Sequence, residues 1–200
     1  MKIGDRVEKL STKAHYKIID FDNKEGDIIL KRVVSGQAVD TTLKVKDLGG
    51  FKIIREKENE ISFFDDEYSF LSNFYEHPVE YDGLIYPTNE HAFQAAKVLD
   101  IKQKEKIKNE SSPSRAKFAG RHVKLRDDWE QVKIDIMYEI CKKKFENKDL
   151  REKLLATGDK ILIEGNTWND DFWGKCTENG KNNLGLILMK IREEIKKEEG

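Results

Sequence analysis

The amino-acid sequence predicts an α+β fold, in which a small antiparallel β-barrel of the SH3-like type precedes a mainly helical domain. The first part of the chain contains short runs rich in isoleucine and valine, separated by turn sequences such as DNKEGD and LGG. Beyond residue 61, apolar residues recur mainly at helical spacing. We therefore predict a β domain at residues 1–56, a charged linker at 57–60 and a helical domain at 61–200.

The β domain is predicted to consist of short strands. These are the runs HYKIIDFD, DIILKRVV, TTLKVKDL and FKIIRE, and such close spacing is typical of small barrels. A small barrel often contacts nucleic acid or a partner, but the nearly balanced charge of this one suits a stabilising or dimerising appendage equally well. Because each domain has its own apolar pattern, we expect a chain that starts near residue 60 to fold by itself.

The helical domain has recognisable helix boundaries. Thr88 can cap a helix that contains Glu90. In the run SSPSRAKFAG, Ser112 is the expected cap, Pro113 the first helical residue and Gly120 the stop. These signals predict two short helices before the longer ones.

Two longer helices are predicted from apolar residues at helical spacing. The first starts near Trp129, behind a cap at Asp127 or Asp128, and the second lies near the end of the sequence. Their apolar positions are Val132, Ile136, Met137, Ile140 and Phe145 in the first, and Leu184, Ile187, Leu188, Ile191 and Ile195 in the second. The runs ISFF, VEYDGLIYP and KILIEG are candidate strands.

Composition argues against several classes of protein. The 37 Lys and Arg residues balance the 38 Asp and Glu residues to a net charge of −1, which is not the charge of a basic nucleic-acid arm. Cys141 and Cys176 lack the spacing of a zinc site or a disulfide framework, and His91 and His122 have no suitably spaced ligand partners. We predict no metal and no cofactor. Without a membrane-length apolar run or a signal-peptide core, we expect a cytoplasmic protein that does not bind membranes.

One predicted helix carries an unusual polar face. In the run YPTNEHAFQAAK, Glu90 is followed on the same side of the helix by Phe93, Gln94 and Lys97. A helix of this length would be expected to turn an apolar stripe to the core. The helix dipole favours an acid in the first turn, which explains Glu90 but not the amide and the amine. We interpret this face as a candidate site.

Other stretches carry more polar and aromatic residues than folding requires, namely FLSNFY, VKLRDDW, NDDFWG and NGKNNLG. None is decisive alone, because Asn-Gly and Asn-Asp-Asp sequences are usually plain turns. Trp129 is more often a core anchor than a ligand contact, whereas a loop residue such as Trp173 stacks on ligands about as often as not. Lys124 and Arg126 more commonly belong to a solvated face than to an anion site.

Taken together and in this order, the motifs resemble the NADAR (YbiA-like) family of N-glycosidases. The resemblance rests on YPTNEHAFQAAK, SSP, LRDDW, NDDFWG and GKNNLG, and it runs from about residue 63 to residue 194. The chain has Phe172 where the family often has tyrosine, and its GNTW segment before Asn169 is slightly long. The resemblance does not cover residues 1–60.

The resemblance implies a hydrolase that cleaves a ribose–nitrogen bond. The expected substrate is ADP-ribosylated guanine, in DNA or RNA or as a nucleotide. The alternative substrate is a phosphoribosyl-type intermediate of riboflavin biosynthesis. A third alternative is a module that binds ADP-ribose or another NAD-derived nucleotide without turnover, against which the retained Glu90, Lys97 and Asp170 argue.

Those three residues are the catalytic set that the resemblance implies. Cleavage of a ribose C1–N bond builds positive charge on the sugar and negative charge on the leaving nitrogen. Glu90 and Asp170, in the acidic positions of the family, are expected to stabilise the sugar cation or activate water, and to protonate the leaving group. Lys97 could attack the imine that forms when the ribose ring opens, or it could neutralise a phosphate.

The remaining predicted site residues are expected to contact the substrate. Tryptophans would stack on the base or wall the ribose, cations would neutralise phosphates, and asparagines would bond sugar hydroxyls or base edges. The predicted substrate-binding set is Phe64, Ser72, Asn73, Phe74, Lys124, Arg126, Trp129, Asn169, Trp173, Gly174 and Asn182.

Overall fold

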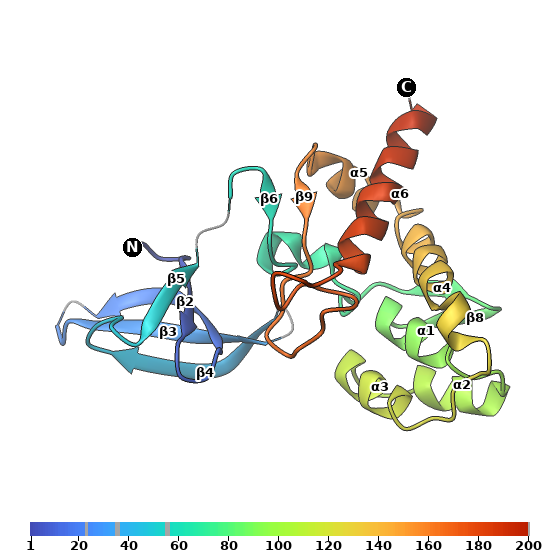
Figure 1. Ribbon diagram of the computed structural model, residues 1–200, viewed down its shortest axis with the longest axis horizontal. Coiled ribbons are helices and arrows are strands. Elements are labelled where there is room, and N and C mark those ends of the chain that lie inside the picture. The colour runs from blue at the N-terminus through green and yellow to red at the C-terminus, as the bar shows by residue number, and fades with distance from the viewer. Residues whose placement is uncertain (23, 35–36, 55–56, 200) are drawn as a thin grey trace.

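The N-terminal part of the chain forms a five-stranded antiparallel sheet, shown in blue to cyan in Figure 1. The computed structural model describes residues 1–22, 24–34, 37–54 and 57–199. The strands are β1 (Arg6–Lys9), β2 (His15–Asp22), β3 (Asp27–Val34), β4 (Gln37–Val45) and β5 (Phe51–Ile54), in the order β4-β3-β2-β1-β5. The predicted antiparallel β segment is therefore present.

The described strands do not show the closed SH3-like barrel that the sequence predicts. Strands β4 and β5 stand at opposite ends of the strand order, and no pairing among the described residues joins them. Strand β1 has the sequence RVEK, whose single valine gives no strand signal, yet it pairs with both β2 and β5. Strand β4 begins at Gln37, earlier than the predicted run at 41.

A small hydrophobic cluster of its own supports this sheet. Alternate residues of one strand point to the same face, so Tyr16 and Ile18 of β2 and Ile28 and Leu30 of β3 are buried together with Val7. Phe51 of β5 packs edge-on against Tyr16, with ring centroids 5.9 Å apart. This cluster is separate from the core of the helical part.

The second part of the chain is mainly helical, and its described residues contain two short strand pairings (Figure 1). Its elements are β6 (Glu60–Ile61), the 3₁₀ helix η1 (Asp66–Leu71), β7 (Val79–Tyr81), β8 (Leu84–Tyr86), α1 (Asn89–Ala95), α2 (Ile101–Lys108), α3 (Pro113–Gly120), α4 (Trp129–Lys144), α5 (Lys148–Ala156), β9 (Ile161–Leu162) and α6 (Asn183–Glu199). β7 and β8 form a hairpin, and β6 pairs in parallel with β9.

Side chains cap α1 and α3, two of the helices that the sequence predicts. The hydroxyl of Thr88 accepts a hydrogen bond from the N–H of His91 at the start of α1, and that of Ser112 accepts one from Arg115 at the start of α3. Asp128 occupies the cap position of α4 but makes no side-chain cap bond. Gly120 is the last residue of α3 rather than a residue beyond it.

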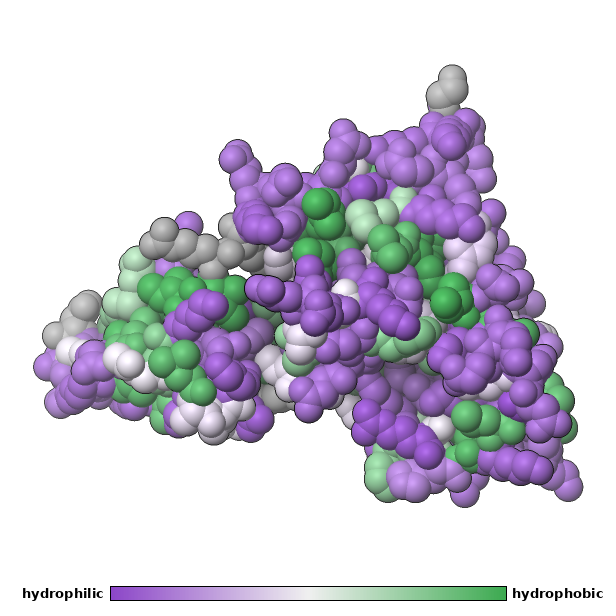
Figure 2. Space-filling model, viewed as in Figure 1, coloured by the Kyte–Doolittle hydropathy of each residue, from purple (hydrophilic) through white to green (hydrophobic). Residues whose placement is uncertain are grey.

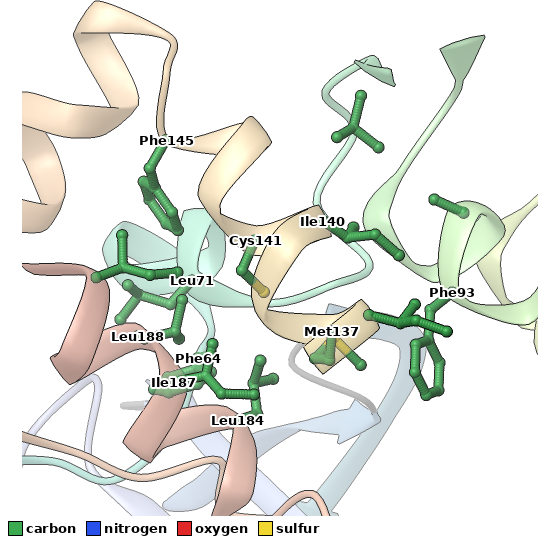
Figure 3. Packing of buried hydrophobic residues seen from close by; sticks show 14 of the residues in the cluster. Phe64, Leu71, Phe93, Met137, Ile140, Cys141, Phe145, Leu184, Ile187 and Leu188 are labelled. Carbon is green, nitrogen blue, oxygen red and sulfur yellow. The ribbon is translucent and has the colours of Figure 1, made fainter. Parts of the chain in front are cut away.

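Helix α4 runs through the core of the helical part. Its buried face carries Met137, Ile140 and Cys141, which lie close to side chains of α6 and of the segment around η1 in Figure 3. The neighbours labelled there include Phe64, Leu71, Phe93, Phe145, Leu184, Ile187 and Leu188. The apolar stripes predicted for α4 and α6 are both present, and in the structure they pack against each other.

The surface of the helical part is mostly hydrophilic on the face seen in Figure 2, whereas hydrophobic residues gather over the N-terminal sheet. Exposed apolar residues of the N-terminal part include Ile3, Leu10 and Ile19. In the described parts of the chain, no helix combines the length and apolar character needed to cross a bilayer.

Candidate active site

A pocket of about 320 Å³ lies among α1, α3, α4 and the β9–α6 loop, which we define as residues 163–182. The residues that line it include all three predicted catalytic side chains and five predicted substrate-binding residues: Ser72, Asn73, Phe74, Glu90, Lys97, Trp129, Asp170 and Trp173. Segments that are far apart in the sequence therefore meet at one cavity.

Glu90 supplies a buried carboxyl group to the wall formed by α1. Its side chain is 5% exposed, and Nε2 of Gln94, one helical turn on, donates a hydrogen bond to its Oε1 at 2.8 Å. Burial raises the pKa of Glu90, while the charge of Lys117, the Gln94 hydrogen bond and Lys97 oppose that rise. The carboxyl group therefore holds a proton more readily than an exposed glutamate.

Gly120 leaves the space that Gln94 occupies. A Cβ atom at Gly120 would lie 2.0 Å from Oε1 of Gln94, so a side chain there would displace the amide. This packing explains the glycine better than a helix stop does. Oε1 of Gln94 is buried and, among the described residues, has no hydrogen-bond partner, which leaves an acceptor at the pocket beside Glu90.

Lys97 lies just beyond α1, which ends at Ala95, so the helix is shorter than the predicted polar face requires. Its Nζ donates to the carbonyl oxygen of Gly120 at 3.2 Å and lies 5.9 Å from the ring centroid of Trp129. Burial lowers the pKa of Lys97; Glu90 opposes this, and the charges of Arg121 and Lys117 add to it. More of this amine is uncharged at neutral pH than in an exposed lysine.

Hydrogen bonds from side chains to the backbone shape the β9–α6 loop. Oδ1 of Asp170 accepts from the N–H groups of Phe172 at 3.2 Å and Trp173 at 2.8 Å. The Asn166 amide bonds both the N–H and the carbonyl of Asp170, at 3.1 and 2.7 Å. Asp170 thus organises a turn and also lines the pocket.

Glu164 is a second acid of the pocket, half-buried as a whole residue, and it is not among the residues predicted from the sequence. Its Oε2 is buried and has no hydrogen-bond partner among the described residues. Burial raises the pKa of Glu164 to about 8; Lys117 opposes the rise, and Asp170 and Glu90 add to it. Glu164 is therefore mostly a neutral carboxylic acid at pH 7.

Aromatic rings also line the pocket. The ring of Phe93 lies 5.1 Å from Trp129 and 5.1 Å from Trp173, and Trp173 in turn meets Phe172 at 5.0 Å. Trp129 is 6% exposed, so it anchors the core and also reaches the pocket. Trp168, from the same loop as Trp173, lines the cavity as well.

The cations at the pocket differ from those predicted. Lys117, Arg121 and Lys133 line it, whereas Lys124 is exposed and does not. The guanidinium of Arg126 makes two hydrogen bonds to Asp128, at 2.6 and 2.9 Å, and lies outside the lining.

Four other predicted binding residues lie outside the lining. Phe64 is part of the hydrophobic core, and Asn169 is exposed with a positive φ of 61°. Gly174 packs so closely on the loop that a Cβ atom would lie 2.3 Å from the carbonyl oxygen of Glu164. Asn182 accepts from the N–H of Glu164 and donates to the carbonyl of Leu162, so it holds the start of the loop.

The missed residues carried weak sequence signals. Glu164 follows a short apolar run and looks like the end of a strand, and Lys117 looks like an exposed residue of a charged helix. Arg121 and Lys133 are likewise indistinguishable from surface cations without their neighbours. Within the described ranges, no group of three or more acids, histidines and cysteines could hold a metal ion.

The fold and the pocket define a small α+β enzyme whose pocket is lined by three acids, a lysine with a lowered pKa and several aromatic rings. The sequence matches the family described as NADAR domain over residues 58–196, and the chain belongs to this family. Residues 1–57 lie outside the match.

Named relatives agree with this assignment. N-glycosidase YbiA of Escherichia coli is 43% identical over 141 residues, which cover 68% of this chain and 88% of YbiA. The riboflavin biosynthesis protein VVA0006 of Vibrio vulnificus is 36% identical over 144 residues, or 69% of this chain and 39% of that protein. The NMR structure of E. coli YbiA superposes with a TM-score of 0.65 at 40% identity, covering 72% of this chain and 89% of that structure. The chain is accordingly an enzyme, a hydrolase of N-glycosyl bonds.

Proposed function

We propose that this protein hydrolyses a ribose C1–N bond and removes ADP-ribose from ADP-ribosylated guanine, in nucleic acid or as a nucleotide. The observation that carries the proposal is the convergence of Glu90, Glu164, Asp170 and Lys97 on one cavity whose walls are aromatic and whose remaining charged residues are cations. The acids suit a ribose that becomes positively charged as its bond breaks, the aromatic rings suit a base, and the cations suit phosphates.

In direct hydrolysis the acids of the pocket have two different roles, one at the ribose and one at the leaving nitrogen. As the C1–N bond breaks, a carboxylate at Glu90 stabilises the positive charge on the ribose or removes a proton from the attacking water. The leaving nitrogen needs a proton, which Asp170 or the neutral acid of Glu164 supplies. Because the pKa of Glu164 is raised to about 8, this group holds a proton that it can donate at neutral pH.

Lys97 offers a covalent route on the same sugar. A ribose joined to an exocyclic amine can open to an imine, and the uncharged amine of Lys97 can add to that carbon. Expulsion of the base amine leaves a Schiff base between Lys97 and the sugar, and water then releases the sugar. The lowered pKa of Lys97 favours this step, because only the uncharged amine is a nucleophile.

The rest of the pocket suits a base and a pyrophosphate. Trp129 and Trp173 present rings for stacking. Arg121 and Lys133 can neutralise phosphate oxygens, a role that replaces the one predicted for Lys124 and Arg126. Ser72 and Asn73 can bond sugar hydroxyls from the segment that follows η1.

A second candidate substrate is a phosphoribosyl-type intermediate of riboflavin biosynthesis. The name of the Vibrio relative favours it, since that protein shares 36% identity with this chain. The chemistry at C1 would be the same, but such a substrate lacks the second ribose and the adenine. Binding of ADP-ribose without turnover is the third candidate, and the acids and lysine of the pocket argue against it.

The test is mass spectrometry of products after the purified protein is incubated with DNA that contains ADP-ribosylated guanine, and separately with the riboflavin-pathway compound. We expect free ADP-ribose and unmodified guanine from the first. Glu90→Gln keeps the size of the side chain but not its proton capacity, so turnover should fall by roughly a hundredfold or more. Turnover of the riboflavin-pathway compound alone would show that this compound, and not ADP-ribosylated guanine, is the substrate. Near-normal turnover in Glu90→Gln would show that Glu90 has no catalytic role.

A further inference from the structure

Phe63 supports the β9–α6 loop at Gly165. A Cβ atom at Gly165 would lie 2.2 Å from the carbonyl oxygen of Ser62 and 2.7 Å from the ring of Phe63, so loop and ring are in direct contact. Glu164 immediately precedes Gly165, and Trp168 follows in the same segment. Both line the site pocket, whereas Phe63 does not, so Phe63 bears on the site only through the loop.

The N-terminal sheet contacts the same ring. Cζ of Arg6, from β1, lies 4.0 Å from the ring centroid of Phe63. The imidazole of His15, from β2, meets it edge-on at 5.2 Å and 81°. A cavity of only about 20 Å³ lies among Arg6, His15, Phe63 and residues 164–168, so the sheet, the ring and the loop are close packed. In Figure 1 the loop lies between the N-terminal sheet and the helices.

Buried charge fixes this contact in one arrangement. Arg6 is 6% exposed and its guanidinium donates to the carboxylate of Asp65, which also accepts from Nζ of Lys17 at 3.3 Å. A buried guanidinium is costly to move away from its carboxylate partner. Burial, helped by the charge of Arg6, lowers the pKa of His15 to about 4, so the imidazole packs as a neutral ring at pH 7.

We propose that the N-terminal sheet is a positioning element of the active site, in which Arg6 and His15 hold Phe63 against Gly165 and thereby keep Glu164 and Trp168 in place. Arg6 and His15 lie outside the part of the chain that matches the NADAR family, whereas Phe63 and Gly165 lie inside it. The inference relies on the proposed ribose–nitrogen hydrolysis for its kinetic readout only.

The test uses Arg6→Met and Phe63→Ala in the full chain. Amide hydrogen exchange should accelerate about tenfold or more in residues 163–174 but not in α4 or α6, because only the support of the loop is lost. kcat should fall on the order of tenfold to a hundredfold, the usual effect of a small misplacement of catalytic groups, while KM changes much less. Phe63→Leu, which keeps an apolar contact with Gly165, should restore part of kcat.

Lys17→Met is the matched control. It removes a cation from the same sheet and from the same carboxylate, Asp65, but does not touch the Phe63 ring. We expect normal loop exchange and normal kcat. Folded Arg6→Met and Phe63→Ala proteins with unchanged loop exchange would overturn the proposal, and so would an equal loss of kcat in Lys17→Met. If no ribose–nitrogen substrate is hydrolysed by the unsubstituted protein, the proposed function fails, while the exchange data still decide the role of the sheet.

Discussion

Lys97 combines the two properties that a nucleophilic amine needs, which are a suppressed charge and a fixed position. Burial lowers its pKa, and the carbonyl of Gly120 holds Nζ at 3.2 Å. A hydride reductant added during turnover should therefore trap a Schiff base, and peptide mapping should place the sugar-containing fragment on Lys97. Lys97→Arg should abolish trapping and turnover, because guanidinium keeps the charge but is a poor nucleophile.

The phosphate-binding alternative for Lys97 gives a different pattern. A lysine that only neutralises phosphate yields no adduct, and arginine in its place keeps a substantial part of the activity. An active protein without an adduct, together with an active Lys97→Arg variant, would leave Glu90 with Asp170 or Glu164 as a direct hydrolytic pair.

Glu164 predicts a pH dependence of stability. Its pKa is raised from 4.5 to about 8 in the folded protein, so the neutral acid is the form that the fold favours. The stability associated with this group is complete below about pH 4.5 and is lost as the pH rises toward 8. At pH 8 the Glu164→Gln variant should therefore have a free energy of unfolding larger than that of the unsubstituted protein by on the order of a few kcal/mol, and it should unfold at a higher temperature, with little difference at pH 4.5.

Thermal melts at the two pH values measure this difference. Glu178→Gln, in an exposed part of the same loop, is the control and should not change the pH dependence. A Glu164→Gln protein whose advantage is the same at both pH values would show that Glu164 is ionised throughout.

Single site residues can be predicted from the sequence when neighbouring residues in the chain form a recognisable motif with them. Glu90 and Lys97 stand in one short motif, and helix spacing places Glu90 beside Gln94, whereas Lys97 lies just beyond the end of the helix. Lys117 and Glu164 come to the same pocket from separate elements, and each looks like an ordinary surface or strand-end residue by itself. Only the tertiary fold gives them their burial and their partners.

Among the elements, the close packing of α1 on α3 is set by a glycine. Gly120→Ala would place a methyl group 2.0 Å from Oε1 of Gln94, so the amide must move and its hydrogen bond to Glu90 weakens. We expect roughly 1–3 kcal/mol of destabilisation, typical of overpacking, and a clear loss of kcat. Gly50→Ala, where an added Cβ meets nothing within 4 Å, should be neutral in thermal melts and in turnover. Full activity in Gly120→Ala would show that the position of the Gln94 amide does not matter for catalysis.

Element prediction succeeds where either signal is strong: caps mark α1 and α3, and apolar stripes mark α4 and α6. Helices α2 and α5 carry mostly charged residues, and the sequence analysis does not identify them. The β6 and β9 strands are two residues each and pair across distant parts of the chain, so no local pattern could specify their partner. Closure of the predicted barrel would likewise need a pairing between strands that stand far apart in the strand order, β4 and β5, and local sequence patterns do not specify such a pairing.

The whole molecule contains two separate hydrophobic clusters, one in the N-terminal sheet and one in the helical part. We therefore predict that the helical part folds without the sheet but needs it for full turnover. A chain that starts at residue 58 should fold, since the cluster around α4 lies entirely beyond that point. Its kcat should nevertheless fall on the order of tenfold or more, because Phe63 loses Arg6 and His15. Circular dichroism and turnover of the truncated chain measure the two effects. An unfolded fragment would show that the sheet completes the core, and an undiminished kcat would show that the sheet does not position the site.

The parallel pairing of β6 with β9 also governs the order in which this protein can mature. It joins Glu60 to Ile161 and Ile61 to Leu162, and closing so long a stretch of chain is slow compared with forming a hairpin. The N-terminal strands, which pair mostly with their neighbours in sequence, can assemble early during synthesis on the ribosome. The loop with Glu164 and Asp170 directly follows β9 in the chain and reaches its place only after β9 has docked. A nascent chain that ends before β9 therefore carries the sheet and helices α1–α5 but neither of these acids, so the site cannot form before the loop has been synthesised.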